Sequence, residues 1–224
     1  MKPQMPPRLH LGCGLETPSG WLNVDGSWQV LLARFPIIKH LLVGVGLLRR
    51  SQTANHWSRE VLRLNLCKPL PFATETFEAV YCSHTLEHLY YRDAVALLRE
   101  CHRVLKHGGI CRFVVPDLET IVNRYVGSKA KGKRDAAMQM MEDLLVHEKQ
   151  RKGGPLALYH RLFAFHQHKW MYDTDSLQLL FESAGFASVR PKGYLESQID
   201  DIGTVENEGR ILGGQGIAVE GTKP

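Results

Sequence analysis

The sequence lacks the paired cysteines that build disulfide frameworks and cysteine-based zinc sites. It has five cysteines, an odd number, spread along the chain with no Cys-x-x-Cys pair. Neither a disulfide framework nor a structural zinc site is therefore expected, and the pattern favours a reduced, cytoplasmic protein. The first eight residues contain three prolines and no apolar segment. They do not have the pattern of a signal peptide.

Long hydrophobic runs are also absent. Residues 28–48 are rich in Leu, Val and Ile, but charged residues and Pro36 interrupt them. The longest uninterrupted stretch, 41–48, is far shorter than the ~20 residues that span a bilayer. We expect one or two packed helices broken at Pro36, in a helical insertion over residues 28–60. Contact with a membrane surface or a second copy through residues 28–48 is the alternative.

The excess of positive charge is small, at +5 for 224 residues. It is concentrated in residues 129–134 and 149–152, which we interpret as solvated surface rather than a nucleic-acid interface. Length and a hydrophobic content of 44% are those of an ordinary globular protein with one domain. We therefore predict a single domain over residues 1–224.

Apolar runs alternate with helical patterns along most of the chain. This alternation predicts an α/β fold with a doubly wound, mostly parallel sheet, helices on both faces and a closing antiparallel strand. The stretch from Ser83 to Leu89 is expected to open a helix, with Ser83 or Thr85 as its cap. Helical patterns are also found over residues 93–105 and 175–184. Expected strands are 9–11, 22–25, 61–66, 77–82, 110–115, 187–193 and 216–220.

Residues 118–170 depart from the simple alternation. Two helical segments, 118–126 and 135–150, flank a basic loop, and a histidine-rich segment follows them. We predict that this stretch is a helical lid on the side of an acceptor substrate.

A glycine-containing turn follows the first predicted strand, and an acid ends the second. Gly12-Cys13-Gly14 allows a tight turn and a close approach of the backbone to a ligand. Asp25 is placed to accept hydrogen bonds from a ribose diol, because ligands bind at the carboxyl ends of parallel strands. The two features together predict a nucleoside pocket.

Two phosphate-binding signatures are incomplete. Thr17 stands where the dinucleotide fingerprint has its third glycine, and no Gly-Lys-Ser/Thr ending is present. A nucleoside without a pyrophosphate, S-adenosylmethionine (SAM), is therefore favoured as cofactor. An NAD-type oxidoreductase and a non-catalytic SAM-binding or interaction protein remain the alternatives.

Six stretches in order resemble one enzyme family over residues 9 to about 193. They read LHLGCG, WLNVD, LNLCKPLPF, TFEAVYCSHTLEHL, LLRECHRVLKHGGICRFVVPDLE and HKWMYDTDSLQLLFESAGF. Together they resemble class I SAM-dependent methyltransferases of the type 11 branch. The resemblance implies a Rossmann-like sheet, SAM as cofactor and transfer of its methyl group.

The resemblance also implies which residues bind the cofactor. Asp25 takes the ribose position, and Asn65 takes the adenine position, where family members usually carry Asp. His10 stands where many members have an acid. The full set of predicted cofactor-binding residues is His10, Gly12, Cys13, Gly14, Asp25, Asn65, Leu66, Ser83 and His84.

The acceptor is expected to be a small molecule or a saccharide hydroxyl, by analogy with the family. A hydroxyl acceptor must lose a proton, and histidine suits that role near neutral pH. His84 and His88 share one face of the predicted helix; a polar anchor formed with Glu87 is the alternative for His88. Asp117 is either a helix cap or an acceptor-side residue, and His168 lies in the segment expected to cover the acceptor.

No metal site is expected from the sequence. His84, His88, Asp117 and the late histidines could converge in the fold, but no spacing between them demands a metal ion.

Overall fold

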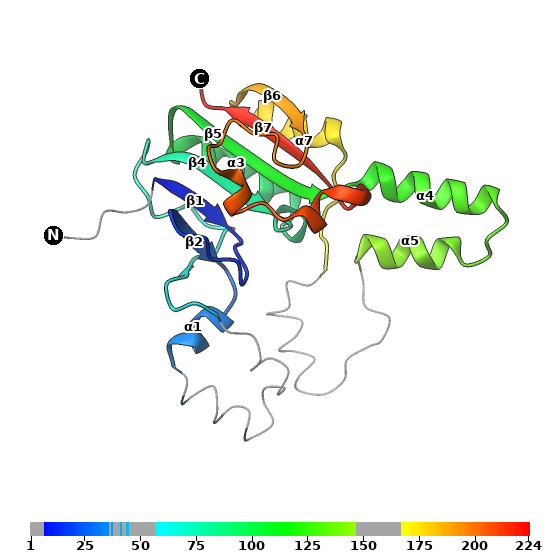
Figure 1. The fold of residues 1–224 in the computed structure, drawn as a ribbon, viewed down its shortest axis with the longest axis horizontal. Helices are drawn as coiled ribbons and strands as arrows, with labels where there is room; N and C mark the ends of the chain where they lie inside the picture. The colour runs from blue at the N-terminus through cyan, green and yellow to red at the C-terminus, as the bar shows by residue number, and fades with distance from the viewer. Residues whose placement is uncertain (1–6, 36, 38–40, 42–43, 45–56, 147–166) are drawn as a thin grey trace.

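The computed structural model describes residues 7–35, 37, 41, 44, 57–146 and 167–224. Its centre is a seven-stranded sheet in the order β3-β2-β1-β4-β5-β7-β6 (Figure 1). All neighbouring strands are parallel except β7, which runs antiparallel to both β5 and β6. The doubly wound, mostly parallel sheet with a closing antiparallel strand is therefore confirmed. The strands are β1 (Arg8–Leu11), β2 (Trp21–Asp25), β3 (Leu62–Arg63), β4 (Phe77–Ser83), β5 (Leu105–Pro116), β6 (Ala187–Lys192) and β7 (Gly216–Thr222).

The strand order reverses at β1. This strand pairs with β2 on one side and with β4 on the other, in parallel register from Arg8 to Leu11 on both sides. In open α/β sheets such a reversal leaves a crevice outside the carboxyl ends of the two strands that flank it. The loops after β1 and β4 are therefore the place where this fold binds ligands.

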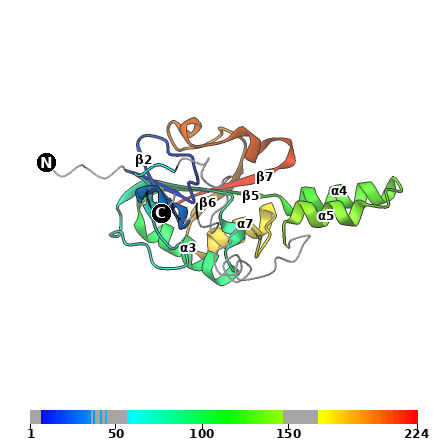
Figure 2. The same ribbon diagram turned by 90° about the horizontal axis from the view of Figure 1, so that it is seen from below.

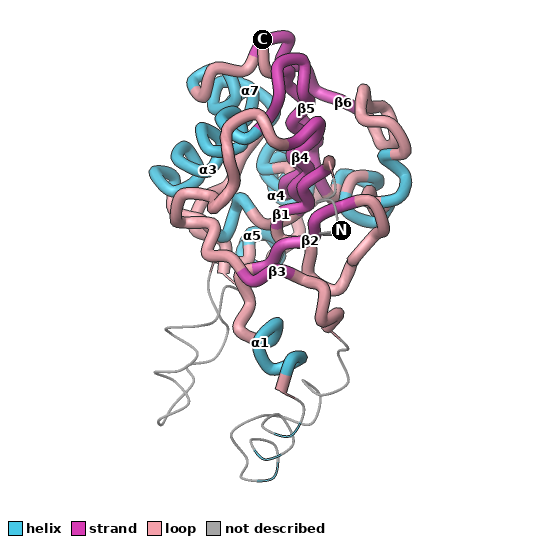
Figure 3. The backbone as a smooth tube through the Cα atoms, turned by 90° about the vertical axis from the view of Figure 1, so that its left-hand side faces the viewer, coloured by secondary structure: helices cyan, strands magenta, loops and turns pink. Residues whose placement is uncertain are grey.

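Two helices cover one face of the sheet, α3 (Tyr91–Val104) and α7 (Thr174–Ser183) (Figures 2 and 3). The buried side of α3 follows the predicted helical stripe. Asp173 and Ser176 form a capping box that starts α7, with the Asp173 carboxylate accepting from the Ser176 amide at 2.8 Å. The largest core cluster lies between these helices and the sheet, and includes Leu9, Leu11, Val80, Leu97, Phe113 and Phe181.

Residues 193–215, which we call the cover loop, pack on the opposite face (Figure 2). Three short 3₁₀ helices interrupt them: η3 (Ile202–Thr204), η4 (Glu208–Arg210) and η5 (Leu212–Gly214). Within the part of the chain that the structure describes, this face thus carries short 3₁₀ helices where longer helices were expected. The apolar residues of this loop reach the sheet from bends and 3₁₀ turns rather than from an α-helix. They are Ile199, Ile202, Val205 and Ile211.

A buried arginine on β5 holds the cover loop in place. The Arg112 side chain has no exposed surface, and its guanidinium pairs with the equally buried Glu206 at 2.7 Å. It also lies 3.5 Å from Glu220 and donates to the carbonyls of Gly193 (2.8 Å) and Glu196 (2.9 Å). A buried charge is tolerated only when it is paired and hydrogen-bonded in this way.

The segment after β4 differs from the prediction of a continuous helix. His84 has a left-handed backbone with φ of +47°, and only the single 3₁₀ turn η2 (Leu86–His88) precedes α3. Neither predicted cap is formed, because the Thr85 hydroxyl donates to the Ser83 carbonyl at 3.1 Å instead. At the other end α3 stops at Val104, so that His107-Gly108-Gly109 lies inside β5.

Helices α4 (Leu118–Ala130) and α5 (Ala136–Leu144) form a hairpin that projects from the end of β5 (Figures 1 and 2). They confirm two helices in the predicted lid, although α5 ends earlier than expected. Residues 147–166 lie outside the described part of the chain, so the lid itself stays a prediction.

The predicted helical insertion over 28–60 is described only in part. Helix α1 (Gln29–Arg34) ends before Pro36, as expected for a helix that a proline interrupts. Most of residues 36–56 are not described. Within the described residues, no helix combines the length and the apolar character needed to cross a membrane.

We expect replacement of Arg112 by Met to lower the free energy of unfolding by about 3–5 kcal/mol, because Glu206 is left as an uncompensated buried charge. Urea denaturation followed by circular dichroism measures this loss. Arg190 is exposed on β6, and Arg190→Met serves as a matched control with a change within about 0.5 kcal/mol. Equal stability of the two variants would contradict the structural role of Arg112.

Candidate functional site

The loop after β1 folds tightly against the turn after β4. Gly12 has φ of +65°, and a Cβ at this position would lie 2.0 Å from the Thr85 hydroxyl oxygen. Gly14 has φ of +57°, but a Cβ there would meet no atom within 4 Å of the described structure. The first glycine is thus required by close packing, and the second borders open space into which a ligand fits.

The Asp25 carboxylate at the end of β2 is oriented by this loop. One oxygen accepts from the Gly14 amide at 2.9 Å, and the other accepts from the Ser27 amide at 2.7 Å. A carboxylate has about four lone-pair sites, so both oxygens can still accept a hydroxyl. Asp25 is half-buried, and its position at the switch point suits a ribose diol.

Two residues predicted to bind the cofactor are buried instead. The Cys13 side chain packs with Val30 and Val61 away from solvent, and burial raises the pKa of its thiol to about 12. His10 donates from Nδ1 to the Asn23 side-chain oxygen at 3.1 Å, and burial lowers the pKa of His10 to about 4. Since alternate residues of β1 face opposite sides of the sheet, His10 points to the cover-loop face. We therefore do not assign the His10 side chain to cofactor binding, and Cys13 can contribute only through its backbone.

Asn65 and Leu66, two neighbouring residues predicted to bind the cofactor, differ in exposure. Asn65 is exposed, and its side-chain oxygen accepts from the Cys67 amide at 3.0 Å, which forms a local turn. Leu66 is buried in the main core cluster. Only Asn65 of the two therefore presents a polar side chain to a ligand.

The turn after β4 is tied to both β5 and the cover loop. The His84 amide donates to the Val114 carbonyl at 2.9 Å, and His84 Nε2 donates to the Arg210 carbonyl at 3.0 Å. Ser83 is buried, and its carbonyl accepts from the Arg210 guanidinium at 3.2 Å. Burial lowers the pKa of His84. These contacts fix the His84 ring at the carboxyl end of β4.

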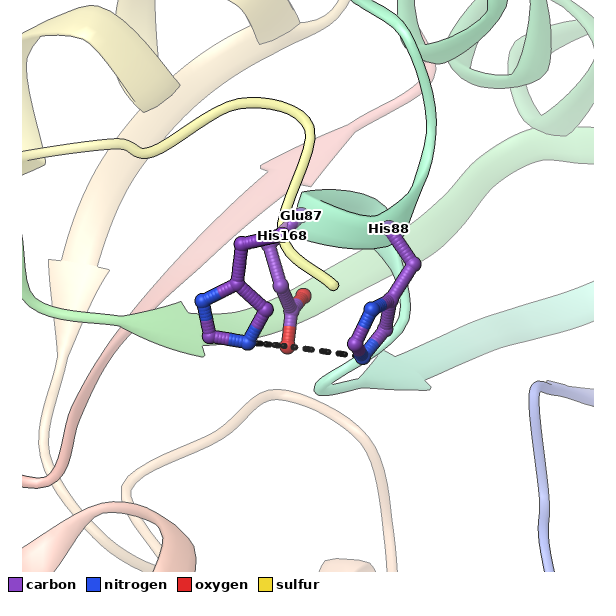
Figure 4. Close-up of side chains that lie close together, drawn as sticks. All are labelled: Glu87, His88 and His168. Carbon is purple, nitrogen blue, oxygen red and sulfur yellow. Dashed lines mark ion pairs between the residues drawn. The ribbon is translucent and has the colours of Figure 1, made fainter. Parts of the chain in front are cut away.

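Three histidines converge on the carboxylate of Glu87. The distances to Glu87 Oε1 are 3.6 Å from His84 Nδ1 and 3.9 Å from Nε2 of both His88 and His168. Figure 4 shows the Glu87 carboxylate between the rings of His88 and His168. Burial raises the pKa of Glu87 to about 8, and burial together with the nearby His88 lowers that of His168 to about 4.

Asp117, the remaining predicted catalytic residue, caps α4. One of its carboxylate oxygens accepts from the Glu119 amide at 3.0 Å, and the other accepts from the Thr120 hydroxyl. The helix-cap alternative is thus confirmed. Its hydrogen bonds hold Asp117 at the start of the projecting hairpin, and Asp117 is not among the residues that converge on Glu87.

The sequence analysis missed two residues at this edge. Glu87 was recognised only as a neighbour of His88, although it lies at the centre of the histidines. Arg210 comes from the cover loop, whose irregular sequence gives no signal, yet it contacts Ser83 and lies 3.7 Å from Glu16 of the glycine loop. A buried acid flanked by histidines, as in His-Thr-Leu-Glu-His, is the one signal that could have found Glu87.

Residues 9–113 match the model of a family described as "Methyltransferase domain". The matched segment contains the glycine loop, Asp25, the turn after β4 and part of β5. Among curated proteins, the uncharacterized protein YBR225W of Saccharomyces cerevisiae is 28% identical over 144 residues. That alignment covers 64% of this chain and 15% of the yeast protein, so the chain spans a small part of that relative's length.

Two solved structures match this chain at low sequence identity. A SAM-dependent methyltransferase from Archaeoglobus fulgidus is 15% identical, with a TM-score of 0.50 over 96% of this chain and 85% of that one. A protein from Thermotoga maritima described as a SAM-dependent methyltransferase is 17% identical, with a TM-score of 0.49 over 97% of this chain and 81% of that one. The first of these establishes similarity of fold.

We expect Gly12→Ala to destabilise the protein by about 1–3 kcal/mol more than Gly14→Ala does, because only the first Cβ overlaps Thr85. Both variants share the cost of about 1–2 kcal/mol for a left-handed alanine, so the difference isolates the contact. Chemical denaturation of the two proteins measures it. Equal losses would show that the loop does not pack against the turn as described.

Proposed function

We propose, from the match of residues 9–113 to a methyltransferase-domain family, that this chain is a class I SAM-dependent methyltransferase that transfers the SAM methyl group to a hydroxyl of a small molecule or saccharide. The observation that carries the proposal is the meeting of three features at one sheet edge. The glycine loop, the ribose-suited carboxylate of Asp25 and the His84 ring all lie at the carboxyl ends of β1, β2 and β4.

The residues at the switch point suit SAM. When bound, SAM supplies an electrophilic methyl group on a sulfonium centre. The open space at Gly14 admits a ligand beside the backbone, and Asp25 offers oxygens to two adjacent hydroxyls. Asn65 follows β3 and offers a polar side chain for the base. Asp25 and Asn65 are thus neighbours along the sheet edge, as the ribose and the base are neighbours in a nucleoside.

The chain's own contribution to transfer is alignment and removal of a proton. Alignment of acceptor and methyl group lowers the barrier by converting a bimolecular step into one within the complex. A hydroxyl also needs a base, and we assign that role to His84. Because Nε2 donates to the Arg210 carbonyl, the neutral ring carries its lone pair on Nδ1. Nδ1 lies 3.6 Å from Glu87 Oε1, so a proton accepted there is placed beside that acid.

The other two predicted catalytic histidines suit the role of base less well. The pKa of about 4 makes His168 a weak proton acceptor at neutral pH, and its side chain is only 5% exposed. His88 Nδ1 donates to the Gln167 carbonyl at 3.3 Å, so His88 holds the segment before Trp170 in place. The His84 and His88 side chains are similarly exposed, at 25% and 22%. His84 is preferred because it directly follows the carboxyl end of β4.

The acceptor class rests on analogy with the family, and the α4–α5 hairpin with the residues after it is proposed as the acceptor-side lid. A cytoplasmic location is proposed from the unpaired cysteines. The family match argues against the NAD-dependent alternative. A SAM-binding protein without catalytic activity remains distinguishable by the two tests that follow.

We expect Asp25→Ala to weaken SAM binding at least tenfold, about 1.4 kcal/mol, through loss of the hydrogen bonds to the ribose. Isothermal titration with SAM, S-adenosylhomocysteine and NAD measures this, and NAD should not bind. Asp200 is exposed on the cover loop, so Asp200→Ala is the matched control and should leave affinity unchanged. Unchanged affinity in Asp25→Ala would show that Asp25 does not hold the ribose.

We expect His84→Ala to slow methyl transfer by about 10²-fold or more, with SAM affinity within a factor of about three of the original. The assay follows S-adenosylhomocysteine release on saccharide and small-molecule hydroxyl acceptors. His107 is largely exposed at the far end of β5, and His107→Ala should retain full activity. Full activity of His84→Ala would place the base elsewhere, and SAM binding without turnover on any acceptor would favour a non-catalytic protein.

A further inference from the structure

The His84–Glu87–His88–His168 cluster has a feature that proton removal does not explain. Glu87 is 1% exposed, and within the described residues neither of its carboxylate oxygens has a hydrogen-bond partner. A buried carboxylate without donors is costly, and native proteins rarely leave one unsatisfied. The ionisable groups within 4 Å of it are imidazole nitrogens, and the Arg210 guanidinium acts on it from farther away.

The hydrogen bonds of the histidines determine what those nitrogens present to Glu87. His88 Nδ1 lies 3.3 Å from the Gln167 carbonyl, and His84 Nε2 lies 3.0 Å from the Arg210 carbonyl. A carbonyl only accepts, so these nitrogens carry the hydrogens. In the neutral rings the opposite nitrogens, which face Glu87, therefore carry lone pairs. A carboxylate and imidazole lone pairs directed at one another are accommodated either by a proton on one of these groups or by a metal cation between them.

We propose that Glu87, His88 and His168 bind a divalent transition-metal ion. Their ligand atoms all lie within 4.8 Å of one another. Two imidazole nitrogens and one carboxylate oxygen form a ligand set that suits zinc and the neighbouring first-row ions. Mg²⁺ and Ca²⁺ prefer oxygen ligands, so this donor set selects against them.

The distances suit such an ion after a small contraction. Ligand bonds of about 2.1 Å in tetrahedral geometry place two ligand atoms ~3.4 Å apart. The separations from Glu87 Oε1 to the two Nε2 atoms are 3.9 Å. These two separations exceed the tetrahedral value by about half an ångström, and the remaining separation, between the two imidazole ligand atoms, is at most 4.8 Å. Three protein ligands leave at least one position of a tetrahedral ion for another oxygen or nitrogen.

The surrounding backbone already holds the ligands in place. The Glu87 carbonyl accepts from the amides of Lys169 (2.7 Å) and Trp170 (3.2 Å), which fixes the segment carrying His168 beside η2. The bond from His88 to Gln167 orients the ring with Nε2 toward the ion. A metal-binding histidine commonly donates its other nitrogen to a carbonyl in this way.

The competing explanation is a polar anchor in which Glu87 carries a proton and donates it to one histidine. Such an anchor needs no ion, and it depends on Glu87 to hold the segment of residues 167–170. The two explanations differ in metal content and in the effect of removing the Glu87 charge. Both can be measured without SAM or an acceptor, so the result does not depend on the proposed methyl transfer.

The experiment uses the full chain without a histidine tag, loaded with Zn²⁺ and dialysed, with bound zinc measured by mass spectrometry. We expect one equivalent in the native protein and a fall in affinity of at least about a hundredfold in Glu87→Gln and His88→Gln. His107→Gln, at an exposed histidine outside the cluster, is the matched control and should retain the equivalent. A competing chromophoric chelator measures the affinities.

Thermal unfolding supplies a second readout in case one variant folds poorly. Zn²⁺ should raise the Tm of the native protein and of His107→Gln, because an ion that binds the folded chain stabilises it. It should leave the Tm of Glu87→Gln unchanged, and metal-free Glu87→Gln should be at least as stable as the metal-free native protein, since the neutral amide cannot become a buried charge. Absence of zinc binding by the folded native protein, or zinc retained in both cluster variants, would overturn the proposal.

Discussion

The buried guanidinium of Arg112 ties together parts of the chain that are far apart in sequence. It pairs with Glu206 and holds two carbonyls of the cover loop, which lets that loop replace a helical layer on one face of the sheet. The same loop carries Arg210, whose carbonyl fixes the His84 ring and whose guanidinium binds the Ser83 carbonyl. The geometry of the candidate site therefore depends on an ion pair on the opposite side of the strand from the main core.

The strands, and the sheet edge proposed to bind the cofactor, could be predicted because their signals are local. Apolar runs ended by Gly12, Asp25 or Pro116 determine where β1, β2 and β5 stop, and the alternation of elements determines that they lie parallel. Since parallel strands bring their carboxyl ends to one edge, Asp25 and the glycine loop were placed together before any contact was known. The carboxylate at the end of β2 needs no distant partner to reach its position.

Other features depend on partners that no local pattern identifies. Arg112 and Glu206 are separated by 94 residues, and His168 reaches Glu87 from a distant segment. The sequence placed His10 at the cofactor, but the pairing with Asn23 and the cover loop bury it. The expected helix start at Ser83 failed because Thr85 packs against Gly12, so long-range contact overrode the capping preference.

Gly12 packs closely on Thr85, so the glycine loop and the turn after β4 are in direct contact. A ligand that displaces the loop must displace the turn, because no space separates them. A ligand in the crevice after β1 and an ion at the site proposed at Glu87 would therefore be linked through this contact, and any such coupling would act equally in both directions.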